Sequence, residues 1–170
     1  MSDIKNEMVR HIPHLRRFAR ALVNGVEVAD DLVQDCLERA WAKRDQWDTR
    51  RNMRPWLFSI MHNLYANNAR RYKRTPSMVP YSELDEMPSA DDQHIELTMT
   101  DLQRALDQVS DEHREILLLI GLEQMSYKES AEALGIPVGT VMSRLTRARK
   151  RLRELMTDPT MPMTMIRRVK

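Results

Sequence analysis

Apolar side chains recur at steps of three and four residues through most of the chain, a spacing that indicates amphipathic α-helices. In the first half, such stripes cover Leu15 to Val23, Leu32 to Trp41 and Trp56 to Leu64. In the second half, they cover Leu102 to Val109 and Ile116 to Ile120. No stretch alternates with a period of two for long enough to predict a strand. The pattern therefore predicts an all-α fold made of two small helical domains.

The most specific local pattern runs from Ser126 to Arg153. Ser126 and Glu129 have the spacing of a capping box, which predicts the start of a short helix. We expect this helix to end at Gly135 and Pro137 to open the next one, because the first turn of a helix leaves its N–H groups unpaired. Two helices joined by a tight turn form a helix-turn-helix, a motif that reads duplex DNA.

The second helix of this motif has two chemically different faces. At about 100° per residue, Val141, Leu145 and Ala148 fall in one sector and are expected to face the core. The opposite sector and its edges carry small, hydroxyl-bearing or cationic side chains, which suit a helix in the major groove. The residues expected to contact DNA are Gly139, Thr140, Ser143, Arg144, Thr146, Arg147 and Lys150. The alternative is a basic, solvated helix in an ordinary bundle.

The formal net charge of +2 conceals a segregation of charge along the chain. Residues 1–74 carry a net charge of +6, and residues 104–170 carry a net charge of +3. Residues 75–103 contain seven acids and no lysine or arginine, which gives this stretch a net charge of −7. The two basic ends suggest contacts with a polyanion at both.

The acidic stretch also contains three prolines and loses the helical periodicity, which indicates a linker between two compact units. An ordinary solvated loop has a similar composition and is the alternative. We expect a first domain over residues 1–75, a linker over 76–96, a second domain over 97–156 and a methionine-rich tail over 157–170.

Six of the nine aromatic residues lie between Trp41 and Tyr72, interleaved with arginines and lysines. Aromatic rings combined with cations suit single-stranded nucleic acid, because unstacked bases stack on the rings. Trp41 and Trp56 also fit the core of a small bundle, since both fall within apolar stripes. The polar segment 48–54 lies between two expected helices and has no role in a core, so it favours the nucleic-acid interpretation.

Other classes of protein are disfavoured. No apolar run approaches the roughly 20 residues that span a bilayer, and the N-terminus lacks a signal peptide, so we expect a cytoplasmic protein without membrane insertion. The single cysteine, Cys36, is expected to be an inert core thiol. His11 and His14 lack a third ligand, so no metal or cofactor is expected. Because common catalytic motifs are missing from the sequence, we expect no enzyme activity and no catalytic residues.

Three stretches in register resemble bacterial RNA polymerase sigma factors of the extracytoplasmic-function class, group 4 of the sigma-70 superfamily. They are residues 29–41 (ADDLVQDCLERAW), residues 54–71 (RPWLFSIMHNLYANNARR) and residues 111–153, and the resemblance covers about residues 10–156. It implies a σ2 domain and a σ4 domain that direct core polymerase to promoters and promote melting of the DNA, in a stress or environmental response. It also implies an anti-sigma factor as a partner.

The resemblance assigns roles to particular residues. Polymerase binding, to the β′ coiled coil, would fall to Asp31, Gln34, Asp35 and Glu38. A second polymerase contact, with the β flap, is expected as well. The single-stranded −10 element would be held by Asp48, Arg50, Arg51, Asn52, Met53, Phe58, Asn63, Asn67, Arg70 and Arg71. The −35 element would be read as a duplex by the helix-turn-helix. Because the segment 48–54 is rich in arginine and lacks glycine, unlike the commoner family wording, we predict no −10 sequence.

One function from another class remains open on the sequence alone. A helix-turn-helix repressor or activator binds duplex DNA as a dimer, at symmetric half-sites and without polymerase. Such a protein has no use for an aromatic and basic segment between Trp47 and Phe58.

Overall fold

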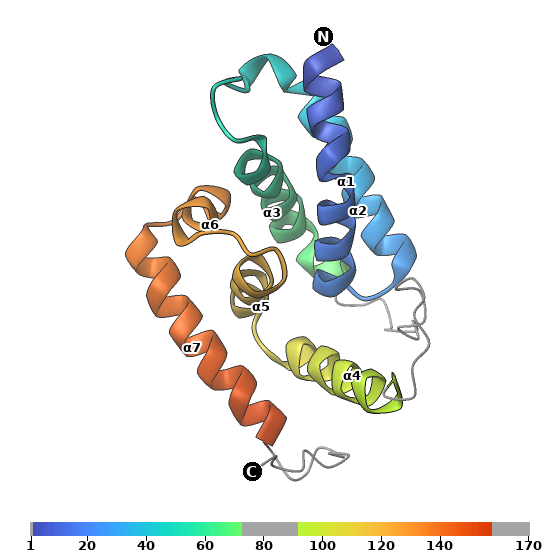
Figure 1. Ribbon diagram of the computed structural model, residues 1–170, viewed down its shortest axis with the longest axis vertical. Coiled ribbons are helices and arrows are strands. Elements are labelled where there is room, and N and C mark those ends of the chain that lie inside the picture. Colours follow the sequence, from blue (N-terminus) through green and yellow to red (C-terminus); the bar gives the residue numbers. More distant parts are fainter. Residues whose placement is uncertain (1, 73–91, 158–170) are drawn as a thin grey trace.

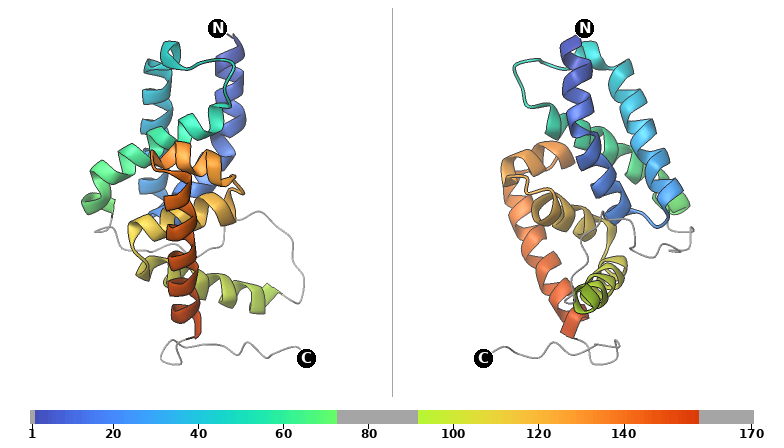
Figure 2. Two further views of the ribbon diagram at one scale, coloured as in Figure 1. Left: turned by 90° about the vertical axis from the view of Figure 1, so that its left-hand side faces the viewer. Right: turned by 45° about the vertical axis from the view of Figure 1, so that its right-hand side comes forward.

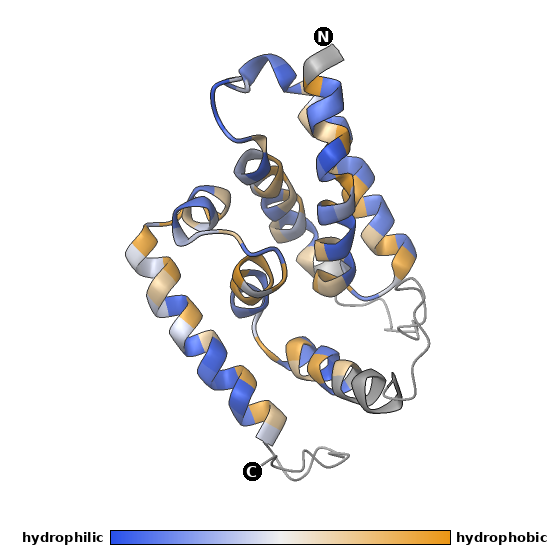
Figure 3. Cartoon of the chain, in the orientation of Figure 1, coloured by the Kyte–Doolittle hydropathy of each residue, from blue (hydrophilic) through white to orange (hydrophobic). Residues whose placement is uncertain are grey.

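Three long helices make up the first half of the protein. The computed structural model describes residues 2–72 and 92–157. The first half contains α1 (Ser2–Leu22), α2 (Val26–Ala42), the short 3-10 turn η1 (Arg44–Gln46) and α3 (Met53–Tyr72). α1 and α2 lie side by side and α3 crosses them, with hydrophobic faces turned toward one another (Figures 1 and 3). Phe18 of α1 and Phe58 of α3 meet edge to face in this core, with ring centroids 5.0 Å apart.

The second half is built from shorter elements around the last helix. It contains α4 (Asp92–Gln108), α5 (Asp111–Leu117), the π-helical turn η2 (Leu118–Leu122), α6 (Tyr127–Leu134) and α7 (Val138–Thr157). α7 packs against α5, α6 and α4, and its contact with α4 buries Ala105, Val109 and Leu155. The fold is all-α, as predicted, and the described residues contain no strand.

The two halves share one continuous hydrophobic core. α3 of the first half lies against α6 of the second (Figures 1 and 2), and α1 contacts η2. Buried residues from Met8 to Tyr72 therefore belong to the same cluster as those from Leu106 to Ala148. The sequence separates these halves by a linker, but side chains that the sequence places far apart pack together here.

The local signals of the helix-turn-helix act as expected, with one shift. Ser126 accepts a hydrogen bond from the Glu129 N–H, and the Glu129 carboxylate accepts one from the Ser126 N–H, which completes the capping box. Gly135 ends α6 in the left-handed conformation, with φ of 63°. α7 begins at Val138 rather than at Pro137, because the Pro137 carbonyl accepts the first bonds of the helix from outside it.

One other boundary differs from the predicted one. α4 begins at Asp92, so residues 92–96, at the end of the linker expected over 76–96, are helical. Residues 76–91 of the expected linker lie outside the described residues, as does the tail beyond Thr157. α3 begins at Met53, and Pro55 lies in its first turn, where a proline is tolerated.

The glycine at the turn gives the first testable prediction. Gly135→Ala is expected to lower the free energy of unfolding by about 1–2 kcal/mol, because a Cβ disfavours positive φ although nothing lies within 4 Å of it. Gly139→Ala is the matched control: the site is equally open, but the backbone is helical, so alanine should stabilise by up to about 1 kcal/mol. Chemical denaturation of both variants measures the difference. Equal effects at the two positions would contradict this account of the turn.

Candidate nucleic-acid and polymerase interface

The face of α7 that is predicted to contact DNA, called the reading face below, is largely exposed. Val141, Leu145 and Ala148 are buried against the neighbouring helices, as their spacing predicts. The residues on the other side of the helix are exposed: Gly139, Ser143, Thr146, Arg147 and Lys150. The helix therefore presents hydrogen-bonding and cationic groups to solvent while its apolar stripe holds it to α5 and α6.

The polar side chains of this face bond to the helix that carries them. The Ser143 hydroxyl donates to the Thr140 carbonyl at 3.2 Å, and the Thr146 hydroxyl donates to the Met142 carbonyl at 3.0 Å. Arg147 Nε donates to the Ser143 carbonyl at 3.3 Å. These bonds tie each group to its own helix rather than to another element. Reorienting them toward a base edge requires rotation about side-chain bonds and leaves the backbone unchanged.

Two predicted contacts of α7 are less accessible, and one exposed residue was not predicted. Thr140 is half-buried, and Arg144 forms an ion pair with Glu112 of α5 at 3.2 Å, with 18% of its side chain exposed. Met142 is 51% exposed beside the polar face and was not predicted to contact DNA. Its position outside the apolar stripe, one residue after Val141, is the signal that identifies it.

The arginine-rich segment before α3 is held by its own side chains. The Asp48 carboxylate accepts hydrogen bonds from the backbone N–H and the guanidinium of Arg50 at 3.0–3.3 Å. These hydrogen bonds lower the pKa of Asp48 below its ordinary value. Asn52 then accepts from the Arg54 N–H at 3.0 Å and caps the start of α3. The segment is therefore an ordered turn that leaves the Arg51 side chain exposed.

The same segment contacts the second half of the protein. Asn52 Nδ2 donates to Glu129 Oε1 of α6 at 2.9 Å. Arg51 pairs with Glu132 of α6 at 3.7 Å, with both side chains largely exposed. Two residues predicted to hold DNA are thus bound to carboxylates of the helix-turn-helix. Glu129 both binds Asn52 and caps α6, since its other oxygen, Oε2, accepts from the Ser126 N–H in the capping box.

Met53 and Phe58 were predicted to hold DNA, but the structure places both in the core. Met53 is 1% exposed and Phe58 is 2% exposed, and both lie on the apolar face of α3 that packs against α1 and α2. Phe58 is occupied by its contact with Phe18. The helical phase of α3 decides this, because the apolar face has to be buried. Asn63 and Asn67 are exposed, as a contact with DNA requires.

The side chains of Arg70 and Arg71 lie outside the described residues, although their backbone belongs to α3. The rings of Trp47 and Trp56 lie beside the arginine-rich segment, half-buried, with centroids 6.4 Å apart. An aromatic pair of this kind, next to exposed cations, is a surface on which an unstacked base can lie.

The predicted polymerase-docking residues share one exposed face of α2. Asp31, Gln34, Asp35 and Glu38 are all exposed. Gln34 Nε2 donates to Glu38 Oε1 at 2.9 Å along this face. Cys36 lies on the opposite side, fully buried, where its thiol donates to the Leu57 carbonyl at 3.5 Å. Burial raises the pKa of Cys36 to about 12, so the thiol is protonated and inert near neutral pH, as predicted.

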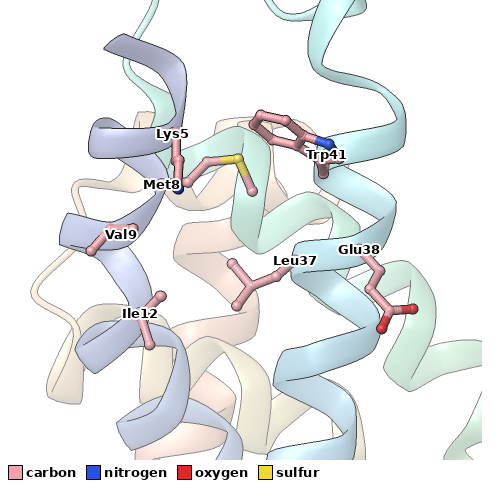
Figure 4. Close-up of a pocket in the computed structure, with 7 residues that line it drawn as sticks. All are labelled: Lys5, Met8, Val9, Ile12, Leu37, Glu38 and Trp41. Carbon is pink, nitrogen blue, oxygen red and sulfur yellow. The ribbon is translucent and has the colours of Figure 1, made fainter. Parts of the chain in front are cut away.

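A shallow apolar groove adjoins the end of this acidic face. The groove lies between α1 and α2 and has a volume of about 320 Å³. Figure 4 shows the side chains of Met8 and Leu37 extending between the two helices. Lys5 and Glu38 lie at its edges, and Trp41 closes one end with 39% of its surface exposed. The arrangement presents apolar surface and charge together.

A carboxylate at the centre of the molecule joins the two halves. The Glu123 side chain, which follows η2, has no exposed surface. It accepts hydrogen bonds from His14 Nδ1 and Arg17 Nε of α1, each at 2.9 Å. It also accepts one at 2.9 Å from Arg54 of α3, which donates to the Glu123 carbonyl as well. His14 thus has a structural partner, and the described residues contain no cluster of three metal-ligating side chains.

A second polar pair joins α3 to α5. His62 Nδ1 and Glu115 Oε1 lie 2.8 Å apart, with Arg144 and Glu112 near enough to influence His62. The hydrogen bond to Glu115 raises the pKa of His62 above 6.5, against the opposing effect of burial. Burial raises the pKa of Glu115 above 4.5, although His62 acts in the other direction. Both folded-state pKa values are therefore raised.

This pair predicts a loss of stability as the pH rises. A histidine whose pKa is raised on folding stabilises fully below its unfolded pKa of 6.5, and that contribution disappears as pH rises through the raised value. The raised pKa of Glu115 changes stability in the same direction. Urea denaturation between about pH 6 and about pH 8.5 should therefore show a larger loss for the wild type than for the double variant His62→Gln/Glu115→Gln.

His113→Gln provides the control for this measurement. Burial lowers the pKa of His113, so its loss should make stability fall more steeply with pH, opposite to the double variant. An unchanged pH dependence in the double variant would mean that the pair does not titrate as its contacts indicate.

An all-α chain with an exposed helix-turn-helix and a separate arginine-rich segment has the form of a DNA-binding transcription protein. Residues 8–62 match the family model described as the Sigma2 domain of PhyR, and residues 99–152 match that of Sigma-70, region 4. Among the helices that the structure describes, none combines the length and apolar character needed to cross a bilayer.

The chain matches two named sigma factors over most of the length of each. The chain is 34% identical over 154 residues to the ECF RNA polymerase sigma factor EcfG of Rhodopseudomonas palustris, covering 91% of this chain and 85% of that one. It is 29% identical over 150 residues to the ECF RNA polymerase sigma factor SigW of Bacillus subtilis, covering 81% and 80%. The chain belongs to the extracytoplasmic-function (ECF) RNA polymerase sigma factors.

Solved structures agree with this assignment. The sigma factor RpoE from Bartonella quintana, in complex with the anti-sigma factor NepR, superposes with a TM-score of 0.71 at 36% identity, over 91% of this chain and 97% of that one. CnrH, in complex with the cytosolic domain of CnrY, superposes with a TM-score of 0.67 at 28% identity, over 89% and 86%.

Proposed function

We propose that this protein binds core RNA polymerase, brings it to a set of promoters and promotes opening of the DNA. The observation that carries the proposal is that one chain presents two different nucleic-acid surfaces. α7 offers an exposed polar face suited to the major groove, and the segment 48–54 offers exposed cations beside the Trp47–Trp56 pair. A duplex-only regulator needs the first surface but not the second.

The acidic face of α2 is the proposed docking site for the β′ coiled coil. Asp31, Gln34, Asp35 and Glu38 are exposed together, and the apolar groove beside Glu38 extends the same surface. A polymerase contact that combines apolar burial with charge pairing would hold the σ2 half, while the β flap would hold the σ4 half. The protein would act in the cytoplasm, where core polymerase is.

Promoter opening would be driven by capture of unpaired bases. Each base-pair step costs a mean of about 1.4 kcal/mol to unstack and unpair. Stacking of an extruded base on an aromatic ring returns roughly 1–3 kcal/mol, and the arginines of the segment 48–54 add attraction to the backbone phosphates. Binding of one strand thus shifts the equilibrium toward the open promoter.

An anti-sigma factor is the second proposed partner. The similar sigma factor from Bartonella quintana was solved with the anti-sigma factor NepR, and CnrH was solved with part of CnrY. We propose that a protein of the NepR kind holds this chain inactive and releases it in a stress or environmental response. Occupation of the α2 face or of the groove beside it would exclude polymerase directly.

Transcription from purified components tests the proposal. The chain and core enzyme are incubated with a genomic fragment library, and transcript starts are mapped together with permanganate-reactive thymines. We expect new starts with unpaired thymines upstream, and a loss of both for Asp35→Arg, but not for Glu154→Arg, at an exposed position of α7 away from this face. Tight binding of duplex DNA without core, and no reactive thymines with it, would instead indicate the dimeric regulator.

A further inference from the structure

The contacts between the two halves occupy groups that promoter binding needs. Asn52 and Arg51, in the segment proposed to hold the −10 strand, are bonded to Glu129 and Glu132 of α6. A carboxylate that accepts from an amide or a guanidinium takes the place a phosphate oxygen would take. While α6 lies against α3, these two side chains are engaged with protein carboxylates.

The two proposed DNA surfaces also lie too close together to reach both promoter elements at once. About fourteen residues, nearly all helical, run from Glu129 to Ser143, so the reading face of α7 lies within roughly 30 Å of Asn52. The −35 and −10 elements, by their names, lie about 25 base pairs apart, which is about 85 Å of duplex. One molecule in this arrangement cannot engage both elements.

A single buried carboxylate holds this arrangement together. Glu123 is surrounded by His14, Arg17 and Arg54, three residues that all belong to the first half of the chain. The next residue, Gln124, has a φ of 53°, and η2 is a π-helical turn. An unusual turn of this kind costs conformational energy and persists where surrounding contacts determine it. Here it aims Glu123 into the other half.

We propose that Glu123 with His14, Arg17 and Arg54 forms a latch that closes the free sigma factor on itself and keeps Asn52 and Arg51 engaged with α6 until core polymerase separates the halves. The inference rests on the proposed function for the consequence of opening, but not for the closure itself. Loss of the carboxylate would leave the guanidinium groups of Arg17 and Arg54 without a counter-charge, so the closed state would lose the attraction between the halves.

Distance measurements on the full-length free chain test the latch. Fluorophores are attached to cysteines placed at Lys43 and Lys128, which are exposed positions in the first and second halves. Cys36 can remain, because it is buried and its thiol is protonated. We expect one closed population in the wild type, and an open-to-closed ratio raised by about tenfold or more in Glu123→Gln. Glu154→Gln, the same change at an exposed site, should leave the distribution unchanged.

A second variant distinguishes opening of the latch from a folding defect caused by the buried substitution. Arg17 is 45% exposed, so Arg17→Gln removes a latch partner without changing the core. It should open the chain as well, while the double variant Arg17→Gln/Glu123→Gln should be no more open than Glu123→Gln, since both remove one interaction. Helical content by circular dichroism should equal that of the wild type in all three variants.

The outcomes separate the latch from the proposed function. A wild-type chain that is already open, or latch variants that stay closed, would overturn the latch even if transcription with core enzyme is normal. Opening of the variants combined with failure of the wild type to bind core would overturn the proposed function and retain the latch. Addition of core enzyme to the labelled wild type should produce the open distances, and closed distances in that complex would also overturn the latch.

Discussion

Arg114→Met is expected to lower the free energy of unfolding by roughly 3–5 kcal/mol, because it removes three hydrogen bonds from a buried guanidinium to backbone carbonyls. Arg114 is 7% exposed, and its guanidinium donates to Leu106 and Asp107 at the end of α4, at 2.8 and 2.9 Å. It also donates to Leu22, the last residue of α1, at 3.1 Å. Carbonyls at helix ends have no partner within the helix, and a cation there is favoured by the helix dipole.

The methionine side chain preserves much of the buried volume, so the loss reports the hydrogen bonds rather than a cavity. Arg104→Met is the matched control: its side chain is 57% exposed and pairs with Asp101 one turn away, so the change should stay within about 0.5 kcal/mol. Urea denaturation followed by circular dichroism measures both variants. A loss in Arg114→Met no larger than in Arg104→Met would show that water replaces the guanidinium at these carbonyls.

Arg147→Ala is expected to reduce promoter-selective transcription by about 10- to 100-fold and to relax the preference for bases in the −35 element. Arg147 is exposed near the middle of the reading face of α7, and its contact is with a carbonyl of its own helix, so it is available to a guanine edge. A two-bonded contact of this kind discriminates against the wrong base by about 1–3 kcal/mol. Start-site mapping on a promoter library with randomised −35 positions gives both readouts.

Arg149→Ala is the control for this prediction. Arg149 is also exposed on α7 but lies to the side of the reading face, where phosphate contacts are expected. Its loss should weaken binding by a similar factor at every promoter and reduce the dependence on salt, without changing the base preference. Identical base preferences for wild type and Arg147→Ala would remove Arg147 from the set of reading residues.

Local patterns in the sequence predicted which side of α7 would be exposed. The spacing of Val141, Leu145 and Ala148 fixed which side of α7 would be buried, and hence which side chains would be exposed. The docking residues of α2 were instead assigned from the family resemblance, and their exposure agrees with the burial of Leu32 and Cys36 on the other side of the helix. Such predictions succeed because the period of an α-helix and the burial of apolar side chains are local properties.

Predictions that rested on the family resemblance failed where the helix turns the residue toward the core. Met53 and Phe58 stand at positions that the resemblance associates with DNA, but the phase of α3 turns both into the core. Arg144 was expected at the edge of the DNA surface, yet it is drawn to Glu112 of α5. Family position specifies a place along the chain, whereas the orientation of a side chain depends on what packs against the helix.

The sequence by itself determined the helices, their caps and the positions of the two surfaces proposed to bind nucleic acid, since these follow from periodicity, turn residues and charge within short segments. Only the tertiary structure decided how the halves meet. In the sequence Glu123 is one acid among many, more than 100 residues from His14 and Arg17, with no pattern that marks it as buried. Its role arises because a desolvated carboxylate needs counter-charges within hydrogen-bond reach, and only the packing of α1, α3 and η2 supplies them.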